Sequence, residues 1–226
     1  MKTKIFNWLG REFVEIVGEG EAGAPPDGAV NDLFREFEAE LKVQGLSLDN
    51  TARIRVWGRD KEARTLATAA RSKILTGKRK AASSSFISRE WFDSEATAGL
   101  EQLALRPLDG ATERNPGDFE PARNYLCYLD YDGLLFFSGF TSEAPTLERQ
   151  TEEVLATIGS ALTRARTDWG KVVKLSALVQ RGHDLDTVRR ALARARRLSV
   201  PDIEYSFVDG FAGEKYLIEI EATAHR

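Results

Sequence analysis

Two carboxylates lie two residues apart in the last patterned stretch of the chain, residues 214–224. Apolar Ile218 and Ile220 alternate there with Glu219 and Glu221. An alternation of period two predicts a strand whose two faces differ, so both glutamates are expected on the same face. A carboxyl group held on such a face can carry a proton to or from a bound water. The alternative is an edge strand whose glutamates are solvated.

Few other side chains have the chemistry of a catalytic or metal site. The single cysteine, Cys127, excludes an internal disulfide and a cysteine-based metal cluster. The two histidines, His183 and His225, lie far apart, so no histidine metal site is expected. Cys127 alternates with Tyr125 on a predicted strand, so both can line one cleft, although a lone cysteine is more often a small buried apolar residue. We therefore predict no metal and no cofactor.

The composition indicates a globular protein of 226 residues. Apolar residues make up 42% and charged residues 30% of the chain, and the net charge is −3. This charge gives no general attraction to nucleic acid or to a membrane. The basic stretch at residues 73–80 fits a helix C-terminus as well as it fits a phosphate site. No signal peptide or membrane span is recognised, so we expect a cytoplasmic protein that binds neither membrane nor nucleic acid.

Hydrophobic periodicity predicts a ββαβαββ order of elements in the first part of the chain. Asp27 or Asn31 is the expected N-cap of the first helix and Asp60 that of the second. Residues 107–121 contain three prolines and two glycines without periodicity, which predicts a linker. The predicted strands cover residues 4–9, 13–17, 52–57, 83–92 and 100–105, and the predicted helices cover 31–44 and 61–76.

The same order returns after the linker, at a spacing of about 120 residues. Asp132 and Gly133 form a strong two-residue hairpin signal. We predict the α+β class, with one domain at residues 1–106, a second at 122–226, and helices on one face of each mixed sheet. The other sheet faces would lie uncovered, so we expect homo-oligomerisation through them. The second set of strands covers 125–131, 134–138, 172–179, 203–208 and 216–223, with helices at 147–165 and 185–195.

The second half resembles the Rid superfamily, also called the YjgF-like or reactive intermediate deaminase family. The resemblance is carried by residues 132–139, by the helix from Gln150 to the stretch ending at Lys174, by residues 184–188 and by the Glu-Ile-Glu-Ala ending at 218–224. It implies a YjgF/chorismate-mutase-like fold in which trimeric sheets form a barrel-like core with ligand clefts at interfaces. The first half resembles the family only in the order of its elements.

The resemblance also implies roles for particular residues. Hydrolytic members carry a tyrosine thirteen residues before the serine of a Ser-Gly pair, and Tyr125 and Ser138 keep this spacing. The first glutamate of the closing strand, which positions or activates water, matches Glu219. The family's carboxylate-binding arginine lies fifteen residues before that glutamate. The position falls on one of three residues that are not arginine: Asp202, Ile203 or Glu204.

A missing arginine matters because only another cation can hold a carboxylate through charge-assisted hydrogen bonds. Arg189, Arg123 and Arg89 are the candidate replacements, and Cys127 is a further candidate for the cleft. The resemblance then implies hydrolysis of an imine, an enamine or a related small carbonyl compound by Glu219, Ser138 and Tyr125. A non-hydrolytic ligand-binding protein and a purely structural duplicate are the alternatives. The chorismatase-like branch also pairs YjgF-like units, but its chains are longer and the sequence shows no motif specific to it.

Overall fold

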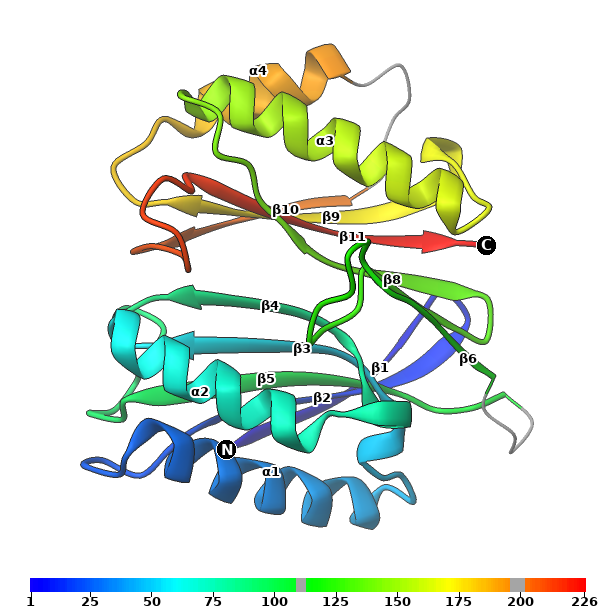
Figure 1. The fold of residues 1–226 in the computed structure, drawn as a ribbon. Coiled ribbons are helices and arrows are strands. Elements are labelled where there is room, and N and C mark those ends of the chain that lie inside the picture. The colour runs from blue at the N-terminus through cyan, green and yellow to red at the C-terminus, as the bar shows by residue number, and fades with distance from the viewer. Residues whose placement is uncertain (109–112, 196–201) are drawn as a thin grey trace.

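The computed structural model describes residues 1–108, 113–195 and 202–226, and it places two β-sheets face to face with helices on both outer sides (Figure 1). The first sheet has the order β1-β2-β5-β3-β4 and the second the order β10-β9-β11-β8-β7-β6. The strands of the first sheet are β1 (Lys2–Trp8), β2 (Arg11–Glu19), β3 (Thr51–Gly58), β4 (Ala82–Ile87) and β5 (Ala98–Leu105). Those of the second are β6 (Arg114–Gly117), β7 (Tyr128–Tyr131), β8 (Leu134–Phe140), β9 (Val172–Gln180), β10 (Asp202–Val208) and β11 (Ile218–His225).

Each sheet is mixed, because it contains one parallel pair of strands and its other pairs are antiparallel. The parallel pairs are β3 with β4 and β9 with β10. The α+β class, with tandem domains and helices on one face of each mixed sheet, is confirmed. Strand β6 lies inside the stretch 107–121 that was predicted as a linker, and it pairs with β7. Residues 109–112 of that stretch lie outside the described residues.

Two helices cover the outer face of each sheet (Figure 1). They are α1 (Pro26–Val43) and α2 (Lys61–Ile74) in the first half, and α3 (Leu147–Arg164) and α4 (Leu185–Ala195) in the second. As predicted, the Asp60 carboxylate caps α2 by accepting a hydrogen bond from the Ala63 amide. The prediction for α1 was wrong, because that helix begins at Pro26, before either predicted cap. A proline at the first helical position fits there, since its fixed φ suits the helix and no amide is left unpaired.

The inner faces of the two sheets pack on each other. One apolar cluster joins Phe13 and Leu105 of the first sheet to Leu129 and Phe136 of the second. Arg53 of β3 extends across the interface and donates a hydrogen bond of 2.6 Å to the carbonyl oxygen of Ala222. Each half therefore covers part of the face that the sequence assigned to an oligomeric partner. Among the described helices, none is long and apolar enough to cross a membrane.

Candidate functional site

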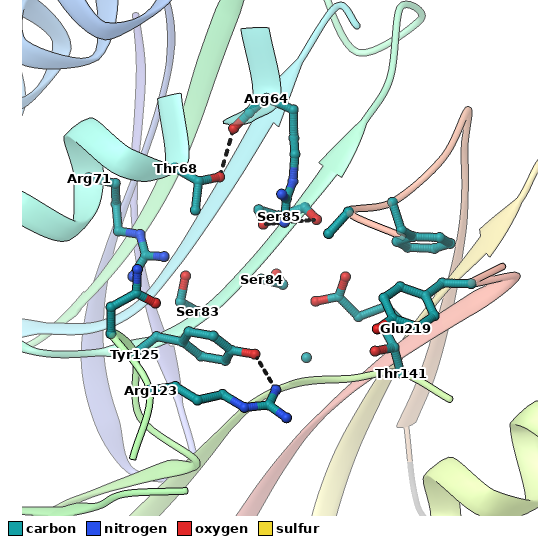
Figure 2. Close-up of a pocket in the computed structure, with 15 residues that line it drawn as sticks. Arg64, Thr68, Arg71, Ser83, Ser84, Ser85, Arg123, Tyr125, Thr141 and Glu219 are labelled. Atoms are coloured by element: carbon teal, nitrogen blue, oxygen red, sulfur yellow. Dashed lines mark hydrogen bonds between the residues drawn. The ribbon is translucent and has the colours of Figure 1, made fainter. Parts of the chain in front are cut away.

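A cavity of about 320 Å³ lies between the two halves (Figure 2). The first half contributes residues of α2 and three consecutive serines of β4, and the second contributes the loop before β7, the end of β8, the loop before β11 and β11 itself. The side chains that matter for chemistry are Arg64, Thr68, Arg71, Ser83, Ser84, Ser85, Arg123, Tyr125, Thr141, Tyr216 and Glu219. Neither half forms this cavity alone, because its walls come from both.

Glu219 is the acidic group of the cavity, and its side chain points into the space shared with Arg64 and Tyr125 (Figure 2). The residue is only 5% exposed. Burial, followed by the negative charge of Glu221, raises the pKa of Glu219 to about 8, although Arg64 and Arg55 act in the opposite direction. The carboxyl group is therefore protonated at neutral pH and can act as an acid.

Gly139, at the end of β8, leaves the room that the Glu219 side chain occupies. A Cβ atom at this position would overlap the Glu219 carboxyl group and its Cγ atom. The glycine of the Ser-Gly pair is thus explained by close approach rather than by a turn.

Three arginines give the cavity a positive potential. Arg64 donates hydrogen bonds to the Ser85 hydroxyl and carbonyl oxygens, and Arg123 donates one of 2.7 Å to the Tyr125 hydroxyl. Arg71 is 3% exposed and forms no hydrogen bond or ion pair through its side chain with any described residue. Burial lowers the pKa of Arg71 to about 10, so the guanidinium is still charged at neutral pH. A buried cation without a partner is costly, which favours an anionic ligand at this point.

Arg64 and Arg71 were missed by the sequence analysis. The periodicity that predicts a helix at 61–76 depends on its apolar residues and says nothing about its arginines. The signal was present nonetheless, because Arg64, Thr68 and Arg71 have the spacing i, i+4, i+7 that places side chains on one face of a helix. Only the packing of that face against β4 and the second half shows that it lines a cavity.

The predicted catalytic residues lie near one another, but not all of them reach the cavity. Tyr125 and Glu219 line it. Ser138 lies behind the wall, where its hydroxyl donates to the Leu126 carbonyl (2.5 Å) and accepts from the Ser83 amide (2.8 Å). Through these bonds, Ser138 ties β8 to β4. Cys127 is 1% exposed in the core of the second half, and burial raises the pKa of its thiol.

The three candidate anchors are separated in space. Arg123 lines the cavity, whereas Arg89 lines a different one together with Arg59 and Asp209. Arg189 lies on the exposed side of α4, with an ion pair of 3.0 Å to Asp186 and its guanidinium over the Tyr205 ring.

Glu204 is one of the three residues at the position of the missing family arginine. It forms an ion pair of 3.1 Å with Lys174. It lines another cavity between the sheets, and not the one that contains Glu219. Among the described residues, no group of histidine, cysteine, aspartate or glutamate side chains is placed to hold a metal ion.

Comparisons with known proteins give a family and a fold. A family model described as endoribonuclease L-PSP matches residues 116–226. No curated protein matches the chain at a significant level. A solved member of the YjgF/YER057c/UK114 family from Mycobacterium tuberculosis is 25% identical and covers 50% of this chain and 100% of its own, with a TM-score of 0.45. A Rid-family protein of unknown function from Yersinia pestis is 21% identical, covers 50% and 100%, and has a TM-score of 0.47.

A solved chorismatase superposes over almost the whole chain. It is 20% identical, covers 99% of this chain and 79% of its own, and has a TM-score of 0.64. This likeness is one of fold, and it extends the comparison to the first half, including helix α2. The family match contains Tyr125, Gly139 and Glu219. Through residues 116–226, the chain belongs to the endoribonuclease L-PSP family, that is, the YjgF or Rid family, and it carries the family fold in tandem.

Proposed function

We propose that the cavity between the two halves hydrolyses a small carboxylate-bearing imine, enamine or enol ether, with Glu219 as general acid and base. The observation that carries the proposal is a carboxyl group buried in a cavity that also contains three arginines, and burial raises the pKa of this group to about 8. An anionic substrate matches the arginines, and a neutral carboxylic acid supplies the proton that these substrates need.

The chemistry requires one proton donor and one water. The Glu219 acid protonates the nitrogen of an imine, or the electron-rich carbon of an enamine or enol ether, and becomes a carboxylate. The resulting cation is attacked by water, and the same carboxylate takes the proton that the water loses. The reprotonated Glu219 then gives its proton to the leaving nitrogen or oxygen, and its carboxylate takes the proton of the new hydroxyl group. Cleavage of the C–N or C–O bond thus gives a carbonyl compound with ammonia, an amine or an alcohol. The arginines hold the substrate carboxylate beside Glu219 throughout.

Two substrates separate the possibilities. Freshly generated 2-iminopropanoate is the simplest carboxylate-bearing imine, and ammonia release reports its hydrolysis. Chorismate carries an enolpyruvyl ether, and the chorismatase with the same fold is named for this compound. Release of pyruvate reports that reaction. Acceleration of one reaction and not the other assigns the class of bond that the cavity cleaves.

The decisive comparison is wild type beside Glu219→Gln. The amide keeps the shape of the side chain but has no acidic proton, so we expect turnover to fall by about 100-fold or more while the protein stays folded. A matched control is Arg189→Gln, on the exposed side of α4, which should leave turnover unchanged. If Glu219→Gln keeps full activity on the substrate that wild type accepts, the proposed mechanism is wrong.

A non-hydrolytic ligand-binding protein of the same fold is the alternative. It predicts that pyruvate binds in calorimetry and that neither substrate is turned over. Assembly into a trimer-like homo-oligomer through sheet faces, a cytoplasmic location and the domain limits 1–106 and 122–226 also stay proposals. Light scattering of the purified chain gives the oligomeric state directly.

A further inference from the structure

Glu221 is a second buried carboxylate beside the cavity. It follows Glu219 by two residues on β11, so the two side chains lie on the same face of the strand. Glu221 is 0% exposed and, unlike Glu219, does not line the cavity. The proposed reaction gives it no role, although its position is strongly determined.

Contacts from the first sheet hold Glu221 in its charged form. The Arg55 guanidinium of β3 lies 2.7 Å from the Glu221 Oε2 atom through Nη2 and 3.1 Å from Oε1 through Nε. Arg53 lies 3.6 Å away, and the Ser84 hydroxyl donates a hydrogen bond to Oε1. Burial acts to raise the pKa of Glu221. The positive charges of Arg55 and Arg53 outweigh this effect and lower the pKa to about 2.

Other charged groups surround this pair. Arg55 also contacts Glu101 of β5 at 3.1 Å and Glu204 of β10 at 4.0 Å. Lys174 of β9 neutralises Glu204 at 3.1 Å. Glu219 makes no ion pair within 4 Å with any described residue, and Arg64 of α2 is the additional cation that acts on it. Arg53 and Arg55 of β3 thus pair with carboxylates other than Glu219, and Glu219 is the group that keeps its proton.

We propose that Glu221 is a positioning residue for Glu219: a fixed negative charge, held across the sheets by Arg55, that keeps the reactive proton on Glu219 at neutral pH. Ser84 connects this charge to the cavity, since it lines the cavity and donates to Glu221. The catalytic consequence rests on the proposed function, but the protonation of Glu219 can be measured without any substrate.

The test is a pH titration of the Glu219 carboxyl carbon by ¹³C NMR in wild type and in Glu221→Gln, with Glu219→Gln to assign the signal. Removing the like charge makes ionisation of Glu219 easier, and the released Arg55 acts in the same direction. We expect the midpoint to move from about pH 8 toward lower pH by about one pH unit or more. An unchanged midpoint in a folded variant would overturn the proposal.

A second variant covers the case in which Glu221→Gln fails to fold, because it leaves Arg55 buried without its main partner. In the double variant Arg55→Gln, Glu221→Gln, both charges are absent and the amides can still hydrogen-bond. Since Glu221 acts on Glu219 more strongly than Arg55 does, the midpoint should still fall, but by less than in the single variant. A midpoint equal to or above that of wild type contradicts the proposal.

The pH dependence of turnover separates this inference from the proposed function. The acid form of Glu219 is lost as pH rises through its pKa, so the alkaline limb of the rate profile should move to lower pH in Glu221→Gln by the shift seen in NMR. If NMR shows the shift and no substrate is turned over, the inference stands and the proposed hydrolysis fails. If turnover occurs and its alkaline limb does not move, the inference fails.

Discussion

The proton on Glu219 is a property of its surroundings. A glutamate on a solvated strand has lost its proton by neutral pH. Here the cavity wall removes water from the carboxyl group, Glu221 adds a like charge, and Gly139 leaves the space in which the side chain sits. Arg64 opposes these effects without cancelling them, so the same residue type gives an acid at position 219 and a fixed anion at position 221.

A buried acid of this kind makes stability fall as pH rises. The pKa of Glu219 is about 8 in the folded protein and near 4.5 when the chain is unfolded. Between these values the folded state binds more protons, so the free energy of unfolding decreases by at most about 1.4 kcal/mol per pH unit from this group. Glu219→Gln removes this dependence. Urea unfolding at pH 5 and pH 8 should show that the free energy of unfolding of wild type falls by up to about 4 kcal/mol more than that of the variant. If the free energy of unfolding changes equally in the two proteins between these pH values, the raised pKa of Glu219 is contradicted.

Strands β3 and β11 are joined by ion pairs that no local pattern connects. Arg55 and Glu221 are separated by 166 residues, yet their contact is one of the shortest between the two sheets. Arg53, two residues earlier on β3, donates to main-chain oxygens of both Ala222 and Phe137. The cost of burying these charges is offset only while every partner is present.

Removing one partner should therefore be expensive. Arg55→Met leaves the Glu221 carboxylate buried without its main cation, and we expect a loss of about 3–5 kcal/mol in the free energy of unfolding at pH 7. Arg35→Met is the matched control, since Arg35 pairs with Asp32 on the exposed surface of α1. That change should have little effect. Chemical denaturation of both variants measures the two losses in the free energy of unfolding. Equal losses would show that the inter-sheet pair contributes no more to stability than the exposed pair.

At the scale of the molecule, the two halves share their cores. Phe13 and Leu105 of the first sheet pack with Leu129 and Phe136 of the second, and the Tyr131 hydroxyl donates to the Leu105 carbonyl at 2.9 Å. A half on its own would expose this apolar face to water. The cavity with Glu219 also depends on this arrangement, because α2 and β4 come from one half and β11 from the other.

We expect one cooperative unfolding transition. Phe136→Ala, at the interface, should cost about 3–5 kcal/mol and lower the midpoint of the whole transition, because the lost packing supports both halves. Phe34→Ala, on the buried face of α1, is the comparison within one half. Differential scanning calorimetry checks the outcome through the ratio of calorimetric to van't Hoff enthalpy. Two separate transitions, with only one half affected by each change, would show that the halves fold independently.

Local patterns account for most of the elements and for part of the site. Alternation placed Glu219 and Glu221 on one face, the Asp132-Gly133 turn has positive φ at both residues as a two-residue hairpin requires, and Asp60 caps α2. Strand β6 was not found, because Arg114–Gly117 has no apolar alternation and is a strand only through its pairing with β7.

The sequence by itself determined the repeated α+β order, the family resemblance of the second half and the candidate glutamate at position 219, because these depend on short-range periodicity and on motif spacing. Tertiary structure alone decided which cations face that acid. Arg64 and Arg71 resemble solvated helix residues until α2 packs beside β4, and Arg55 meets Glu221 only when the sheets stack. Burial and long-range electrostatics set protonation and ligand charge, and neither is encoded in the pattern of any single segment.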